Sequence, residues 1–170
     1  PRTAEETKHT SSPSMDISKA SNFERFVFDM TGRNAEEVRK LWSKVDNNKS
    51  FDISGTLLWE KIRKSHIISG TSNHRERIEI IREMHRKYGV LVDPHTADGL
   101  KVGLNYREKN TPLICLETAL PAKFSESIVE AIGAEPSRPD GYDNLEDLPQ
   151  NFVEMDADAA EIKAFISLNI

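Results

Sequence analysis

The stretch VLVDPHTADGL (residues 90–100) determines how we interpret the fold of this chain. Its first three residues are apolar and do not alternate with polar residues, which is typical of a strand buried on both faces. The pair Asp93-Pro94 ends this run, and a helical pattern of apolar residues begins at Thr96 and continues to residue 107. The stretch therefore predicts a junction between a buried strand and a helix.

Two other short apolar runs have the same character, His66-Ile67-Ile68 and Leu113-Ile114-Cys115-Leu116. A helical pattern follows each of the three runs, over residues 74–87, 96–107 and 121–132. Alternating strands and helices are typical of a parallel sheet with right-handed crossovers. We therefore predict an α/β fold, with a short parallel sheet of about three strands and crossover helices.

The remaining parts of the chain have different patterns. Two capping-box spacings, Ser21 with Glu24 and Asn34 with Glu37, indicate the starts of two helices before the sheet. The second of these helices carries an apolar stripe, namely Val38, Leu41, Trp42 and Val45. The predicted parts are an extended polar arm over 1–14, a helical segment over 15–64, a βαβαβα lobe over 65–134, and a loop with a C-terminal helix over 135–170.

Composition limits the possible partners and surroundings of the protein. The 170 residues carry a net charge of -5 and no basic stripe, so we expect no nucleic-acid partner. No apolar run approaches the ~20 residues that cross a bilayer, and no signal peptide is visible, so we expect no membrane partner. Cys115 is the only cysteine, which fits a cytoplasmic protein. The first residue is Pro1, and we expect the chain to be part of something longer.

Three loops rich in small hydroxyl residues follow the three predicted strands, over residues 69–73, 93–99 and 117–121. In open α/β sheets, ligands bind at the carboxyl ends of the strands, which is where these loops would meet. Helix N-capping is the alternative for each loop taken singly, because Ser, Thr, Asn and Asp bind the free amides of a first turn. Three such loops at one edge favour a binding site.

Two other chemistries have weaker support. Asp93, His95 and Asp98 offer carboxylate and imidazole ligands, but they match no fixed metal motif, and we predict no metal site. Cys115 could be a nucleophile, but it lies inside an apolar run, where cysteine behaves as a small hydrophobic residue.

Three blocks of the sequence resemble one enzyme family, in the same order along the chain. They are SSPSMDISKASNFERFVFDMTGR (11–33), YGVLVDPHTADGLKVG (88–103) and LICLETALPAKFSESI (113–128). The family is that of bacterial threonine synthases of the long, yeast-like type. The resemblance implies the fold of the tryptophan synthase β-subunit group and a dependence on pyridoxal 5'-phosphate (PLP). It also implies conversion of O-phospho-L-homoserine and water to L-threonine and phosphate.

The resemblance covers only the C-terminal part of that family. It implies that the lysine that binds PLP and the Gly-rich loop for the cofactor phosphate belong to a missing N-terminal portion, which would be the partner of this chain. The eight glycines here are dispersed, so no run of them could form a phosphate cradle. We therefore assign no catalytic residue to this chain and expect it to be inactive alone.

The resemblance assigns cofactor contacts to the PHTADG turn. A Ser or Thr at a strand-to-helix junction faces the pyridine nitrogen of PLP in this fold group, and Thr96 is the matching residue, with His95 beside it. A neutral hydroxyl partner does not require the nitrogen to be protonated. The alternative role for Thr96 is the N-cap of the helix over residues 96–107.

The resemblance also suggests substrate contacts in the SNFER segment. Ser21, Asn22 and Arg25 could bind the substrate phosphate at a helix N-terminus. Alternatively, Ser21 only caps the helix and Arg25 pairs with a surface carboxylate. We interpret Lys123 as a solvated helix residue rather than a substrate contact. The rival functions are a small-anion-binding or regulatory α/β module without catalysis, and a structural lobe for subunit contact.

Overall fold

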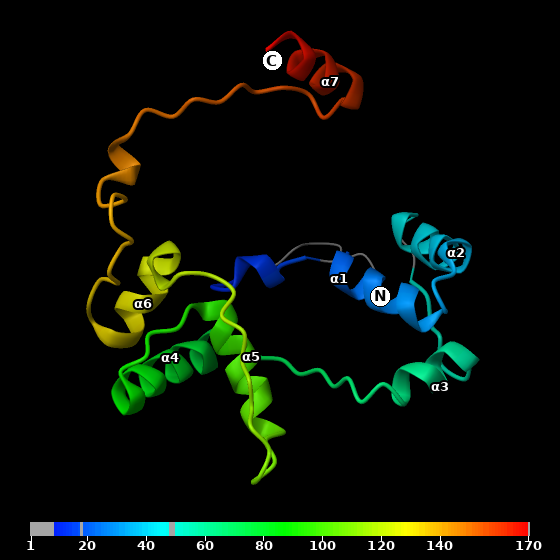
Figure 1. Cartoon of the computed structure of the whole chain (residues 1–170), viewed down its shortest axis with the longest axis horizontal. Coiled ribbons are helices and arrows are strands. Elements are labelled where there is room, and N and C mark those ends of the chain that lie inside the picture. Colours follow the sequence, from blue (N-terminus) through cyan, green and yellow to red (C-terminus); the bar gives the residue numbers. More distant parts are fainter. Residues whose placement is uncertain (1–8, 18, 48–49, 170) are drawn as a thin grey trace. The chain divides into compact units, whose positions relative to one another are not determined.

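The computed structural model describes residues 9–17, 19–47 and 50–169, and its regular structure is helical (Figure 1). The expected polar arm lies outside the described residues over positions 1–8. The α-helices are α1 (Ser21–Met30), α2 (Ala35–Asp46), α3 (Leu57–Arg63), α4 (His74–Tyr88), α5 (Pro94–Asn105), α6 (Ser125–Ile132) and α7 (Ala159–Leu168). Three short 3-10 helices are η1 (Pro13–Met15), η2 (Pro121–Phe124) and η3 (Leu145–Asp147). The chain divides into two compact units between Ser137 and Arg138.

The predicted parallel sheet is wrong, because the part of the chain that the structure describes contains no β-strand. The three apolar runs are non-helical segments beside the helices. A strand requires a neighbouring backbone to exchange hydrogen bonds with, and none of the runs has one among the described residues. Nor are the runs buried on both faces, since Ile67 is 62% exposed and Ile114 is 81% exposed.

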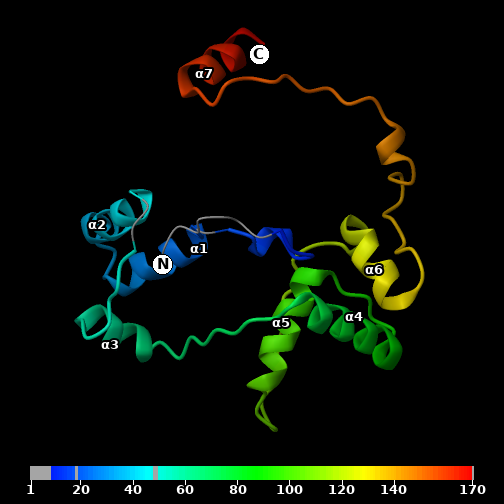
Figure 2. The same ribbon diagram turned by 180° about the vertical axis from the view of Figure 1, so that it is seen from behind.

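Helices α4, α5 and α6 surround one hydrophobic core in the first unit (Figure 2). Asn73 and Glu76 form a complete capping box at the start of α4, and Gly89 ends this helix in the left-handed conformation, at φ 67°. Gly133 ends α6 in the same way, directly after the predicted helical pattern over residues 121–132. The buried residues of this core are Ile78, Ile80, Ile81, Val92, Ala97, Ile128 and Ala131.

Two glycines on α5 allow a neighbouring segment to approach this helix closely. A Cβ atom at Gly99 would lie 3.2 Å from Cys115 Sγ, and one at Gly103 would lie 3.1 Å from a methyl group of Leu113. One side of the apolar run over 113–116 therefore packs directly against α5, and the opposite side of the run is exposed.

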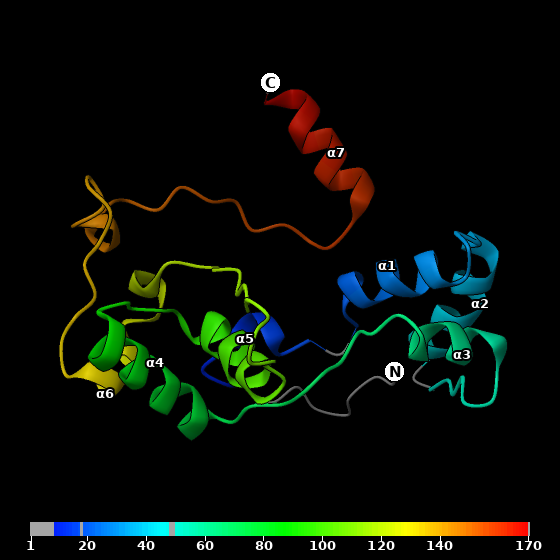
Figure 3. The same cartoon turned by 60° about the horizontal axis from the view of Figure 1, so that its bottom comes forward.

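Helices α1, α2 and α3 share a second core in the first unit (Figure 3). Asn34 caps α2 by accepting hydrogen bonds from the backbone N–H groups of Glu36 and Glu37, so this predicted helix start is confirmed. The predicted capping box at Ser21 is wrong, because the N-cap of α1 is Ala20 and has no side-chain cap. The buried residues of this core are Val27, Val38, Trp42, Val45, Phe51 and Leu58.

The second unit contains η3 and α7. Asp158 caps α7 by accepting hydrogen bonds from the N–H groups of Ala160 and Glu161, so the predicted C-terminal helix is present and begins at Ala159. An ion pair between Arg138 and Glu146 links the first residue of this unit to η3. Within the described residues, none of the helices is both long and apolar enough to cross a membrane.

Candidate functional site

Asp93 organises the start of α5. Its side chain is fully buried, at 0% exposed, and its carboxylate accepts hydrogen bonds from the backbone N–H groups of His95 (2.9 Å) and Thr96 (3.4 Å). Pro94 occupies the first position of the helix, where no N–H donor is required. Asp93 is therefore the N-cap, and the alternative that Thr96 caps this helix is wrong.

The hydroxyl group of Thr96 connects two of the predicted loops. Thr96 is only 4% exposed, and its Oγ1 donates a hydrogen bond to Asp93 Oδ2. The same oxygen accepts a hydrogen bond from the backbone N–H of Thr118 at 3.2 Å. The remaining loop, over residues 69–73, also contacts the first turns of α5, because the Ser72 hydroxyl donates to Asp98. The structure therefore brings all three hydroxyl-rich loops together, although no sheet edge does so among the described residues.

His95 holds η1 against α5. The backbone N–H of Ser14 donates to His95 Nε2 at 3.0 Å, so this ring nitrogen is an acceptor and carries no proton. The other nitrogen, Nδ1, lies 2.9 Å from Asp93 Oδ1 and donates to it. The ring also packs edge-on against Phe124, with centroids 4.9 Å apart. Both nitrogens are thus engaged within the protein, and neither is available to a ligand.

Arg77 is a buried cation that the sequence analysis missed. Its Nε donates to Asp98 Oδ1 at 2.7 Å, and a terminal nitrogen donates to the Ser11 hydroxyl at 2.8 Å. The Arg77 side chain is 7% exposed, so the ion pair is largely shielded from water. Asp98 therefore faces Arg77, whereas Asp93 faces His95. Among the residues that the structure describes, no three His, Cys, Asp or Glu side chains gather as metal ligands.

Cys115 lies close to the same turn but is poorly suited to be a nucleophile. Its Sγ is 3.8 Å from the backbone oxygen of Thr96. Burial raises the pKa of the Cys115 thiol, and the negative charge of Asp93 raises it further. The thiol is therefore protonated at neutral pH, and only the thiolate is a strong nucleophile.

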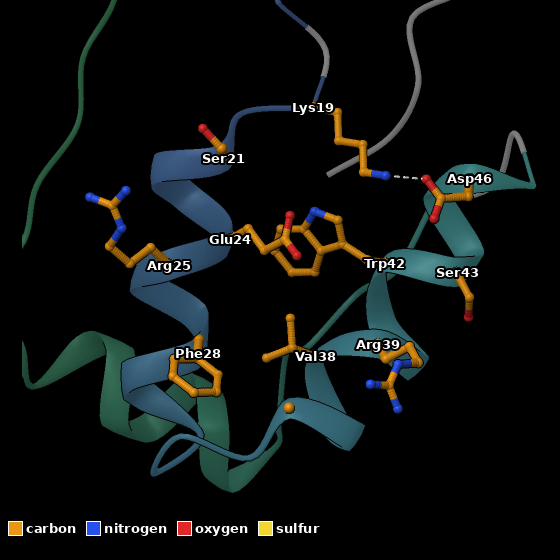
Figure 4. A pocket seen from close by; sticks show the side chains of 11 residues that line it. Lys19, Ser21, Glu24, Arg25, Phe28, Val38, Arg39, Trp42, Ser43 and Asp46 are labelled. Carbon is orange, nitrogen blue, oxygen red and sulfur yellow. Dashed lines mark hydrogen bonds and ion pairs between the residues drawn. The ribbon is translucent and has the colours of Figure 1, made fainter. Parts of the chain in front are cut away.

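The predicted substrate residues lie on the first turns of α1 (Figure 4). Ser21 begins the helix, and Ser21, Asn22 and Arg25 are all exposed. Arg25 forms no ion pair within residues 9–17, 19–47 and 50–169, so the alternative of a surface ion pair for Arg25 is not observed. Its guanidinium points away from α2, whereas Glu24 points toward Trp42.

A cavity of about 530 Å³ lies between α1 and α2. Lys19 and Asp46 form an ion pair at its edge, which the sequence analysis did not anticipate. Val38 and Trp42 line its interior. Two of the predicted substrate residues, Ser21 and Arg25, also line this cavity, although the guanidinium of Arg25 points away from α2. Lys123, on η2, is exposed, in agreement with its interpretation as a solvated residue.

Comparison with known proteins defines the class to which this arrangement belongs. Residues 96–166, which begin at the buried threonine, match the family described as "Threonine synthase, C-terminal". The chain is similar in structure to a PLP-bound threonine synthase from Brucella melitensis, with a TM-score of 0.76 and 33% identity. That match covers 95% of this chain and 34% of the Brucella chain.

The sequences of longer relatives agree. The chain is 57% identical to the threonine synthase of Methylobacillus glycogenes over 98% of its own length, and 42% identical to that of Corynebacterium glutamicum over 97%. It belongs to the threonine synthase family and corresponds to the C-terminal part of these enzymes. The chain spans 35% of the length of both relatives.

Proposed function

We propose that this chain works as the C-terminal part of a threonine synthase, which uses PLP to convert O-phospho-L-homoserine and water to L-threonine and phosphate. The observation that carries the proposal is the high identity to threonine synthases across nearly the whole chain, including the buried Thr96 turn. The Brucella threonine synthase is PLP-bound, which supports the choice of cofactor. When bound, PLP supplies an electron sink for the reaction.

Thr96 is the residue we propose as the cofactor contact. A hydroxyl group has one proton to donate and two lone pairs that accept. In this structure the proton goes to Asp93 and one lone pair binds the Thr118 N–H, which leaves one lone pair for the ring nitrogen. The low exposure of Thr96 fits a contact from which water is excluded. His95 would act on the same site indirectly, by holding Asp93 in place.

The start of α1 is the region we propose for the substrate phosphate. Its first amides lack a side-chain cap, and free amides at a helix N-terminus bind anions. Ser21 and Asn22 add polar side chains, and Arg25 adds a guanidinium with no carboxylate partner among the described residues. The phosphate would bind on the outer side of α1 rather than in the cavity between α1 and α2.

The rest of a longer threonine synthase is the partner we propose for the exposed apolar segments. Several large side chains are far more exposed than is usual, namely Ile67 (62%), Ile68 (55%), Val90 (50%), Ile114 (81%) and Leu116 (76%). Large exposed apolar patches mark interaction sites. Because the relatives are almost three times as long as the matched region, the remaining portion is large enough to cover these residues. That portion would also supply the lysine that binds PLP and the loop that binds the cofactor phosphate.

Borohydride reduction tests how the two portions share these roles. The complete enzyme, reduced in the presence of PLP and mapped by mass spectrometry, should carry one stoichiometric label on a lysine outside this chain. The 170-residue chain alone should carry no stoichiometric label and release no phosphate from O-phospho-L-homoserine. A stoichiometric label on one lysine of the isolated chain, with turnover, would overturn the proposal. Phosphate binding by the complete protein without PLP uptake would favour an anion-binding module instead.

A further inference from the structure

We propose that Asp93 is a positioning residue that keeps the ring nitrogen of the cofactor protonated, acting through the hydroxyl of Thr96. This inference rests on the proposed function, because it assumes that Thr96 meets the ring nitrogen. It differs from the expectation for a neutral hydroxyl partner, which does not require a protonated nitrogen. The direction of each hydrogen bond around Asp93 supports this role.

The carboxylate of Asp93 already accepts from four donors. Oδ1 accepts from the backbone N–H of His95 and from His95 Nδ1, each at 2.9 Å. Oδ2 accepts from the backbone N–H of Thr96 at 3.4 Å and from Thr96 Oγ1. An ionised carboxylate offers about four lone-pair positions, so all of them are occupied. With 0% exposure, no water can replace a donor that leaves.

The His95 donor cannot reverse its direction. The backbone N–H of Ser14 occupies His95 Nε2, and a backbone amide can only donate. His95 must therefore keep its proton on Nδ1 and direct it to Asp93. The edge-on contact with Phe124 holds the ring in this orientation. The orientation of the carboxylate is thus fixed from the His95 side.

This arrangement keeps the hydroxyl proton of Thr96 in the hydrogen bond to Asp93. If the hydroxyl turned its proton toward a neutral ring nitrogen, the buried Asp93 Oδ2 would lose its strongest donor, and hydrogen bonds to an ionised acceptor are the strong ones. If the proton stays on Asp93, Thr96 Oγ1 offers the nitrogen only a lone pair. The second arrangement requires a ring nitrogen that is itself protonated. Asp93 therefore favours the protonated ring.

The ¹⁵N chemical shift of the ring nitrogen reports its protonation directly. The complete enzyme is loaded with PLP labelled at this nitrogen, and solid-state NMR spectra are referenced to free PLP at acid and alkaline pH. The wild-type resonance should lie upfield, close to that of protonated PLP. A wild-type resonance at the position of unprotonated PLP overturns the inference without any variant, so the test does not depend on a variant that folds.

The variant Asp93→Asn should reverse the signal. Asn remains a good N-cap, and its oxygen should take the Oδ1 position, where it has two close donors. Its amide nitrogen then faces Thr96 Oγ1 as a donor and releases the Thr96 proton toward the ring nitrogen. The resonance should move downfield to the unprotonated position. An unchanged resonance in this variant, with bound PLP, would overturn the inference.

Asp98→Asn is the matched control. It removes an equal charge from the same helix, but Asp98 bonds with Arg77 and Ser72 rather than with Thr96. The ring-nitrogen resonance of Asp98→Asn should match that of the wild type. A downfield shift as large as that of Asp93→Asn would show that the lost charge alone moves the resonance, and would overturn the role of the hydrogen bond from Thr96 to Asp93. If the complete wild-type protein takes up no labelled PLP, the proposed function fails rather than this inference.

Discussion

The bonds of His95 can be separated with three substitutions at one position. His95→Asn keeps an N–H donor near the Nδ1 position but loses the acceptor for Ser14 and the contact with Phe124. From those two losses we expect destabilisation of about 1–3 kcal/mol, since a neutral hydrogen bond and an aromatic pair each contribute about 0.5–1.5 kcal/mol. His95→Ala also removes the donor to the buried carboxylate of Asp93. That loss should add about 1.5–3 kcal/mol.

Urea denaturation followed by circular dichroism at 222 nm measures these differences, because the described regular structure is helical. The third substitution, His95→Gln, can restore an acceptor for Ser14 but not the donor to Asp93, so it should fall close to the alanine variant. Hydrogen exchange gives a second signal, in which the Ser14 amide should exchange faster in the Asn and Ala variants. Equal stabilities of the Asn and Ala variants would show that the bond from His95 to Asp93 contributes nothing.

Three further substitutions or reactions test other contacts. Arg77→Met should destabilise the protein by about 3–5 kcal/mol, because it leaves the largely buried Asp98 unpaired, and urea denaturation will measure the loss. Arg25→Ala should change stability by less than about 0.5 kcal/mol but raise KM for O-phospho-L-homoserine by roughly 10–100-fold. The control variant Arg39→Ala, at an exposed residue, should leave KM unchanged. Equal KM values for the two variants would remove Arg25 from the substrate site. At pH 8, iodoacetamide should alkylate Cys115 more slowly than it alkylates a cysteine in a short peptide, because the raised pKa of the Cys115 thiol keeps it protonated. The reaction should accelerate only at higher pH. An alkylation rate equal to that of the peptide would show that the thiol is not shielded.

Local features of the fold were predictable from the sequence. The cap at Asn34 and the stripe on α2 depend on residues within a few turns of each other, and both are present in the structure. The stop at Gly133 likewise depends on one residue that adopts the left-handed conformation easily. The strands were not predictable, because a strand depends on a distant backbone partner. Ile67 and Ile114 have the composition of strand residues but no such partner among the described residues.

Parts of the candidate site were predictable in outline only. Asp93 before Pro94 is a typical N-cap followed by the first helical residue, but the predicted helix over 96–107 overlooked this signal and begins two residues too late. The buried pair of Arg77 with Asp98 had no such signal. The two residues are 21 positions apart, and only the packing of α4 against α5 brings them together.

The turnover of Thr96→Val in the complete enzyme tests most directly whether this turn contacts the cofactor. Loss of stability alone cannot decide, because valine removes a donor to Asp93 and an acceptor for Thr118 whatever the role of the residue. Turnover is therefore measured on folded protein saturated with PLP, beside Thr96→Ser, which keeps the hydroxyl. We predict that the Ser variant keeps most of the activity and that the Val variant loses roughly one to two orders of magnitude, as expected for one buried hydrogen bond of about 1–3 kcal/mol. A folded, PLP-saturated Val variant that turns over at the wild-type rate would show instead that Thr96 serves only the structure of α5.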